Sequence, residues 1–215
     1  LLYRLLEHHG NINDTKFIKE IMSNPESLME IIDKTYLSSD ENERAVEIEQ
    51  VKNDNSYALL GWHIFYTLRQ TPFVDSNNTI DEVALNNYID QLQTLGNAKH
   101  KIKGVNTVIG EFLGNYPETE DYPSIPICDI IERLNNKEVN NGFRTRLYNK
   151  RGVTVRPAYE GGTLEKNEAD KYKKYADKIR YTHPIVCSIF DDLSRDYYQI
   201  AKNEDIRVKI EKMEF

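Results

Sequence analysis

The sequence predicts an all-α protein, an irregular multi-helix bundle of about nine helices with at most a vestigial strand. Apolar residues recur every three or four positions along most of the 215 residues, which is the period of an amphipathic helix. Helix-start signals recur between these segments, and only Val153-Thr154-Val155 suggests an extended piece. No repeat of about 34 or 40 residues is visible, so the pattern does not favour a regular solenoid.

The N-terminal part of the chain begins with short helices that have clear end signals. Residues 1–9 place leucines at helical spacing and stop at Gly10, the residue expected just past a helix end. A second helix begins at Asn13 or Asp14. A third begins at Asn24-Pro25, because Asn is a good N-cap and Pro suits the first helical position.

The next two segments differ sharply in polarity. Residues 38–56 contain six acidic and two basic side chains, which favours a solvated helix, with a mobile connector as the alternative. Val46 and Val51 are its few apolar anchors. Residues 56–70 carry the strongest apolar signal of the chain, on nearly all sides of a helix, so we expect a central buried helix there.

The middle of the chain supplies two more helices and the clearest break. Thr79 and Glu82 fit a capping box, in which each side chain satisfies the other residue's free amide at the start of a helix. Another helix covers about 105–113. Residues 115–126 then hold three prolines with acids between them, which is typical of a loop. We expect one helical domain that this loop could divide into two subdomains: 1–215 overall, with parts 1–114 and 127–215.

The last part of the chain is predicted as helices on either side of one irregular loop. Pro126 opens a helix, a short one follows, and residues 149–162 are not helical. Thr163 is expected to cap the next helix. Thr182-His183-Pro184 repeats the cap-and-proline start at the head of the last, long helix.

Composition and charge exclude several classes of protein. The formal net charge of −7 argues against a nucleic-acid or anionic-membrane binder that uses its whole surface, because a uniform negative field repels phosphates. No apolar run is long enough to span a membrane, and no signal-peptide pattern is present, so we expect a cytoplasmic protein. Cys128 and Cys187 are too far apart for a zinc spacing, and they do not form a disulfide framework.

Catalytic and metal-binding motifs are missing from the sequence, so we predict no metal and no cofactor and lean away from an enzyme. His183 with Asp191 and Asp192 is the one set that suggests metal or acid–base chemistry. Those carboxylates lie about two helical turns beyond the histidine, too far to share one ion with it.

The most distinctive segment is basic. Between Phe143 and Tyr159 there are five basic residues and no acid, although the chain as a whole is acidic. Arginine forks match phosphate or carboxylate groups, and glycine backbones can approach a ligand closely, so we predict an anion site here. Tyr148 and Tyr159 could stack on bases. The alternative is an ordered loop whose arginines pair with acids elsewhere, such as Asp121, Glu132 or Glu160. The candidate ligand-binding residues are Arg144, Arg146, Asn149, Arg151, Arg156, Gly161, Gly162 and Glu165.

The second half of the chain also has a particular order of short motifs. These are Tyr122-Pro123-Ser124-Ile125-Pro126, Ile130-Ile131-Glu132, Asn149-Lys150-Arg151-Gly152-Val153, Arg156, Gly161-Gly162, Glu165 and Tyr172-Lys173-Lys174-Tyr175-Ala176. This order resembles the C-terminal helical region of long, uncharacterised bacterial multidomain proteins. The resemblance covers about residues 57–210 and is strongest around 149–165. It implies a terminal helical module of a larger protein, which the opening at Leu1 fits, and it implies no catalytic residues.

Three functional hypotheses follow. The first is an interaction or scaffold module of a larger bacterial protein, with other domains of that protein or separate proteins as partners. The second is a nucleic-acid or nucleotide-phosphate binding domain that uses the basic loop 143–156. The third is an enzyme with the 149–165 loop lining its pocket and Glu160 or Glu165 as the acid–base group.

Overall fold

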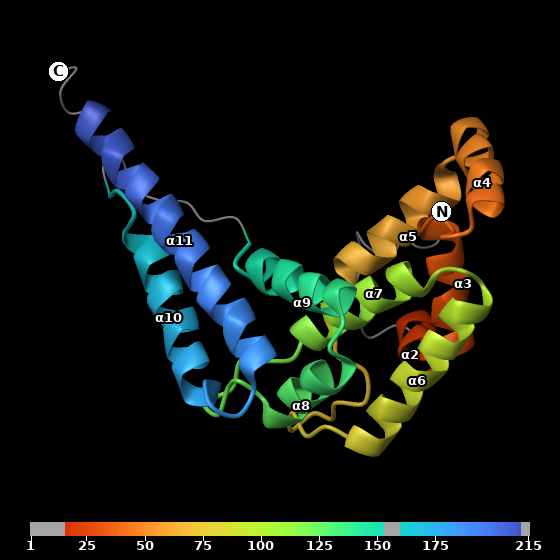
Figure 1. The fold of residues 1–215 in the computed structure, drawn as a ribbon, viewed down its shortest axis with the longest axis horizontal. Helices are drawn as coiled ribbons and strands as arrows, with labels where there is room; N and C mark the ends of the chain where they lie inside the picture. Colours follow the sequence, from red (N-terminus) through yellow and green to blue (C-terminus); the bar gives the residue numbers. More distant parts are fainter. Residues whose placement is uncertain (1–15, 153–159, 212–215) are drawn as a thin grey trace. The chain divides into compact units, whose positions relative to one another are not determined.

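The computed structural model describes residues 16–152 and 160–211, and in these ranges the protein is all-α, as the sequence predicts (Figure 1). The β-type pairing found there is an isolated bridge between Val74 and Ile80. The predicted helix 1–9 and the predicted extended piece 153–155 lie outside the described residues. The described helices are α2 (Lys16–Ser23), α3 (Pro25–Thr35), α4 (Glu41–Asn53), α5 (Ser56–Thr67), α6 (Glu82–Ala98), α7 (Ile102–Gly114), α8 (Ile125–Leu134), α9 (Lys137–Lys150), α10 (Thr163–Ile179) and α11 (Pro184–Glu211).

The chain divides into two compact units. Unit 1 comprises the residues up to Pro117 together with Asn136–Phe143, and unit 2 comprises Glu118–Asn135 together with the residues from Arg144 onward. The first change of unit, after Pro117, falls inside the proline-containing segment 115–126. Residues 136–143, at the start of α9, belong to unit 1. None of the described helices combines the length and the apolar character needed to cross a membrane.

Unit 1 is built around α3, α6 and α7, with α2 and α5 packed against α3. Its helices bury one apolar stripe each, as amphipathic helices of a globular core do. The Tyr88 hydroxyl of α6 donates to the backbone oxygen of Ile21 of α2 at 2.7 Å, so the one polar atom of this buried ring is satisfied. The fully buried aliphatic side chains of this core include Ile18, Leu28, Ile32, Leu85, Ile89, Leu92, Val105, Ile109 and Leu113.

Helix starts follow the sequence signals in one case and depart from them in another. Asn24 caps α3 as predicted, because its side chain accepts from the backbone NH groups of Glu26 and Ser27. The predicted capping box at Thr79 is wrong. Asp81 caps α6 and accepts from Ala84, since Thr79 instead pairs its backbone with Asp75 in the preceding turn.

Two glycines allow α7 and the first part of α9 to touch at backbone distance within unit 1. A Cβ placed on Gly142 would lie 2.2 Å from the backbone oxygen of Thr107, and one placed on Gly110 would lie 2.1 Å from that of Val139. Real Cβ atoms do not come so close to backbone oxygens. The crossing therefore requires glycine on both helices.

Unit 2 is dominated by the long antiparallel pair α10 and α11 (Figure 1). Aromatic rings fill their contact: Tyr172 stacks on Tyr197 at 5.8 Å and on Phe190 at 6.1 Å between centroids. Helix α11 begins at Pro184, as the sequence predicts, but its cap comes from another helix. The Glu132 carboxylate of α8 accepts from the backbone NH groups of Ile185 and Val186.

Candidate interaction surface

Helix α4 is almost entirely exposed. No residue in its 13 is buried, and Glu47 is the one residue that is half-buried. The solvated helix predicted for residues 38–56 is therefore present, but the prediction that Val46 and Val51 anchor it is wrong, since both side chains are exposed. A short isolated helix is only marginally stable in water, so α4 must be held by other means.

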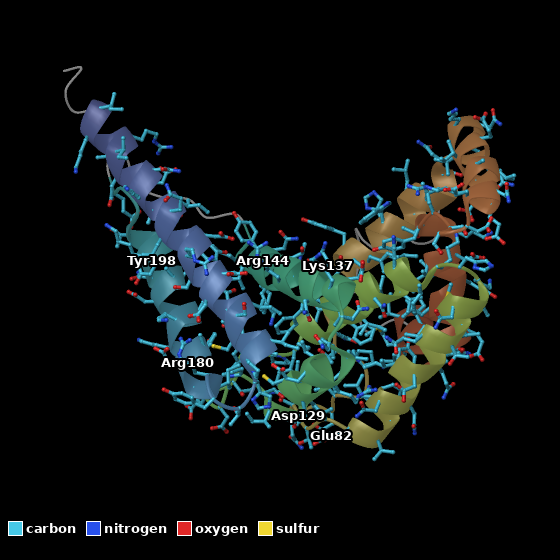
Figure 2. All side chains as sticks on the ribbon, viewed as in Figure 1. Glu82, Asp129, Lys137, Arg144, Arg180 and Tyr198 are labelled. Atoms are coloured by element: carbon cyan, nitrogen blue, oxygen red, sulfur yellow. The ribbon has the colours of Figure 1, made fainter. Side chains whose placement is uncertain are left out.

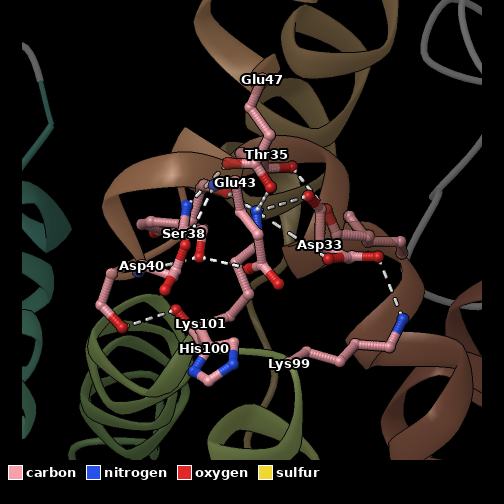
Figure 3. Close-up of polar contacts among 12 residues, drawn as sticks. Asp33, Thr35, Ser38, Asp40, Glu43, Glu47, Lys99, His100 and Lys101 are labelled. Carbon is pink, nitrogen blue, oxygen red and sulfur yellow. Dashed lines mark hydrogen bonds and ion pairs between the residues drawn. The ribbon is translucent and has the colours of Figure 1, made fainter. Parts of the chain in front are cut away.

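Polar contacts hold α4 in place (Figure 3). Asp40 caps its N-terminus, accepting from the backbone NH groups of Asn42 and Glu43. The Glu43 carboxylate accepts from the Ser38 hydroxyl at 2.7 Å, and Glu47 accepts from the Ser38 backbone NH at 2.7 Å. These bonds tie the helix to the segment before it.

Lys101, at the N-terminus of α7, also makes a polar contact with α4 from a buried side chain. Its side chain is 2% exposed, and its Nζ donates to Glu47 Oε1 at 2.6 Å (Figure 3). The same ammonium donates to the backbone oxygens of Tyr36 at 2.6 Å and Asp33 at 3.1 Å. Three acceptors thus satisfy all three hydrogens of a buried cation, and a single residue joins α4 to the end of α3.

Helix α5 has apolar residues on two opposite faces. Ile64, Phe65 and Leu68 are buried on one side, where Gly61 allows close approach to Thr35 of α3. On the other side Leu59, Trp62 and Tyr66 are 49%, 52% and 69% exposed. The prediction of a central buried helix is therefore wrong, because one face of α5 is buried while these side chains of the opposite face stay about half exposed or more.

Three of the exposed side chains of α5 form a stripe. Leu59, Trp62 and Tyr66 are spaced as i, i+3 and i+7, which places them on one side of a helix. Apolar residues at this spacing normally face the core of a protein. Single exposed apolar residues are common on protein surfaces, whereas a contiguous exposed stripe indicates an interaction site. We call Leu59, Trp62 and Tyr66 the α5 stripe.

Two pockets lie beside α4 in unit 1. One of about 500 Å³ is lined by the end of α3, by Leu37, by α4 and by Ala58 at the start of α5. The other, of about 510 Å³, lies between α4 and the segment around Lys101. Asp33, Glu47 and Gln50 line both pockets. Helices α4 and α5 follow each other in the chain, joined by Asp54 and Asn55 (Figure 1). Together they line a pocket and carry an exposed apolar stripe.

The arginines of the predicted anion site are engaged within unit 2. Arg144 on α9 (Figure 2) pairs with Asp196 of α11, and Arg151 pairs with Glu165 at 2.7 Å. Arg146 is buried, with 9% of its surface exposed. The sequence left open that these arginines pair with acids such as Asp121, Glu132 or Glu160. In the structure, Arg144 and Arg151 pair with Asp196 and Glu165 instead.

The glycines of the same predicted site serve the backbone. Gly161 has a φ of 69°, and its neighbour Gly162 packs against α11, where an added Cβ would lie 2.3 Å from the Ala201 oxygen. Gly162 donates its NH to Asp205 at 2.9 Å and is the N-cap of α10, so the expectation that Thr163 caps this helix is wrong. Asn149 is exposed and accepts from the Gly152 NH through its backbone oxygen. Arg156 and Tyr159 lie outside the described residues.

The tyrosines beside these arginines form a stack. Tyr148 stacks on Tyr197 at 5.4 Å, and Arg151 lies over the Tyr197 ring at 5.6 Å. Burial lowers the pKa of Lys150 to about 8, because desolvation disfavours its charged form. The structure thus brings Arg151 and Glu165 into one contact and places Tyr148 at the end of a ring stack.

His183 and Asp191, two members of the histidine set, have separate partners. His183 Nε2 lies 2.9 Å from Asp129 Oδ1, while Asp191 is held by Arg180 and Lys173. In the part of the chain that the structure describes, no group of three or more His, Cys, Asp or Glu side chains is placed to hold a metal ion.

Comparisons of the chain with protein-family models, with curated proteins and with solved structures find no match. Function is therefore inferred from the chain's own residues. Sequence reasoning missed the α4–α5 surface, although one signal was available. Residues 56–70 are apolar on nearly all sides of a helix, whereas the preceding residues 38–56 are strongly acidic. An acidic helix cannot bury the apolar faces of its neighbour, so one of those faces is expected to stay exposed.

Proposed function

We propose that the chain is a helical interaction module and that the exposed side of α4 and α5 is its docking surface. The observation that carries the proposal is the α5 stripe, three large apolar side chains at helical spacing. Each of them stays about half exposed or more in the structure, although the Trp62 ring contacts the Tyr36 ring at 5.7 Å between centroids. Exposed apolar patches of this kind mark interaction sites, and Trp and Tyr are enriched among the residues that dominate binding energy.

The partner is another protein, or another domain of a longer bacterial protein of which this chain is the C-terminal module, acting in the cytoplasm. The resemblance of residues 57–210 to such modules supports this setting. The two cysteines, Cys128 and Cys187, are both free and buried, as is usual in a reducing compartment.

The anion-binding hypothesis has less support in the geometry. Arg144 and Arg151 each face a carboxylate within unit 2, so a phosphate would have to displace an existing ion pair from either of them. The enzyme hypothesis has little support in the geometry. Its candidate acid–base group Glu165 is 1% exposed and is paired with Arg151.

The test compares the chain with a stripe variant, Leu59→Ser/Trp62→Ser/Tyr66→Ser. Each is immobilised and used to capture proteins from an extract of the source cells, and the retained partner is then purified and its Kd measured against both. We expect the stripe variant to bind at least about 30-fold more weakly, because losing buried aromatic anchors costs about 2 kcal/mol or more.

A matched control carries the same kind of change at other exposed positions, Val83→Ser/Ile125→Ser/Tyr181→Ser. It should retain the partner with unchanged affinity, and circular dichroism should show the same helix content in all three proteins. The proposal fails if the stripe variant and the control bind every captured protein as tightly as the unaltered chain does.

A further inference from the structure

The charges of α4 and of the pocket at the start of α5 indicate which kind of partner the docking surface fits. Residues 40–54, which include α4, carry six acidic and two basic side chains, and this segment is joined directly to α5. Two of the acids, Glu43 and Glu47, accept hydrogen bonds from Ser38 and Lys101. Glu41, Glu49 and Asp54 are exposed, and Glu49 pairs with Lys52 at 2.6 Å, so the segment presents net negative charge to solvent.

The pocket between α3, α4 and α5 repeats this combination of apolar and acidic groups. Its apolar lining includes Leu37, Val51 and Ala58, and its charged lining has three carboxylates and one ammonium, Lys34. Two of the carboxylates, Asp33 and Glu47, also pair with Lys99 and Lys101, and the third is Asp54. A side chain with an apolar stem and a cationic end, such as Lys or Arg, matches both features. An acidic side chain would meet repulsion at the same place.

The shape of the surface favours a helix as the partner element. The α5 stripe has the spacing that a helix uses to pack on another helix, with side-chain ridges of one lying in the grooves of the other. Amphipathic helices bind to such surfaces through apolar anchors at i, i+3, i+4 and i+7.

From this complementarity we infer that the docking surface receives a basic amphipathic helix, whose apolar stripe packs on Leu59, Trp62 and Tyr66 and whose lysines or arginines face the carboxylates of α4. This inference rests on the proposed function and names the partner class for the same surface. Electrostatic complementarity of this sort fixes the choice and orientation of a partner more than it adds affinity.

The experiment uses three fluorescent peptides of about 20 residues, long enough to form a helix on binding. The first has leucines at i, i+3, i+4 and i+7 and lysines elsewhere. The second has glutamates in place of the lysines. The third has the composition of the first with the leucine spacing scrambled. Fluorescence anisotropy measures the Kd of each peptide for the chain at about 50 mM and 300 mM salt.

We expect the first peptide to bind at least about tenfold more tightly than the other two. The stripe variant should lose this binding. A charge variant, Glu41→Gln/Glu49→Gln, should bind about threefold more weakly at low salt and nearly equally at high salt, because exposed charges are screened. Its matched control, Glu120→Gln/Asp121→Asn, removes the same charge from exposed positions in unit 2 and should leave the Kd unchanged.

Several results would overturn the inference. They are equal binding of the acidic or the scrambled peptide, binding of the chain to phosphatidylcholine vesicles that the stripe variant loses, and dimerisation in sedimentation that the stripe variant abolishes. If the lysine peptide does not bind while the stripe variant still loses a captured partner, the partner class is wrong and the docking surface stands. If neither effect is seen, both proposals fail.

Discussion

At the scale of single residues, several charged side chains of this protein form ion pairs within the chain. Lys101 is the clearest case, since a buried ammonium bonded to Glu47, Asp33 and Tyr36 holds a helix that has no buried residue. The sequence alone does not distinguish Lys101 from the nearby Lys99 and Lys103. The difference comes from burial and from three acceptors that belong to segments more than 50 residues away.

Asp191 lends itself to a pH test. Its carboxylate accepts from Arg180 at 2.8 Å and from Lys173 at 3.0 Å, and these hydrogen bonds lower its pKa to about 2. Since the folded pKa lies below the unfolded value of about 3.9, Asp191 stabilises the fold above that value and ceases to do so as pH falls through 2. We expect Asp191→Asn to lower the free energy of unfolding by about 1 kcal/mol at pH 7, since the site is partly exposed to solvent. The gap should close towards pH 2.

Urea denaturation of both proteins at several pH values measures this difference. Asp192→Asn, at an exposed surface pair with Arg195, is the control and should change stability little at any pH. A deficit for Asp191→Asn that stays constant between pH 7 and 2 would mean that packing, and not charge, is lost.

At the scale of elements, helix boundaries follow local chemistry while helix environments do not. Asn24-Pro25 and Pro184 start helices where the sequence predicts, because a cap or a proline acts within one turn. The start of α11 nevertheless takes its cap from Glu132 of another helix. The exposure of α5 likewise could not be predicted, because its two apolar faces are equivalent until α3 covers one.

The crossing of α7 and α9 gives a prediction at this scale. Alanine at position 142 would gain helix propensity of about 1 kcal/mol, but its Cβ would clash with backbone atoms of α7 that cannot move independently. We expect Gly142→Ala to destabilise the protein by about 1–3 kcal/mol overall, measured by thermal and urea unfolding. Asn141→Ala, at the adjacent exposed position, gains propensity without a clash and should be neutral or stabilising. Stabilisation by both substitutions would contradict the close crossing.

At the scale of the whole molecule, the net charge of −7 includes a basic segment whose charges are partly neutralised within unit 2. The sequence located this segment at 143–159 and left open whether its arginines bind a ligand or acids of the chain. Partners of Arg144 and Arg151 come from α11 and α10, and Asp196 lies 52 positions from Arg144. Such pairings depend on the folded arrangement and leave no local signal.

This pairing leads to a prediction about nucleic acid. We expect short single-stranded DNA and RNA to show no saturable binding in fluorescence anisotropy at about 50 mM salt, because the acidic chain repels phosphates and the paired arginines are already satisfied. Asp196→Asn, which removes the acid facing Arg144, should raise binding only slightly. Tight binding that weakens steeply with salt would restore the anion-site hypothesis.

The sequence by itself determined the fold class, most helix starts and the unusual polarity of residues 38–56, since each of these depends on interactions within a few residues. Only the tertiary structure decided which face of α5 is covered, that α4 is fastened through Lys101, and which acids meet Arg144 and Arg151. These depend on contacts between segments far apart in the chain. The physical reason is that helical periodicity reports how many apolar faces a helix has, whereas the packing of its neighbours decides which of those faces water reaches.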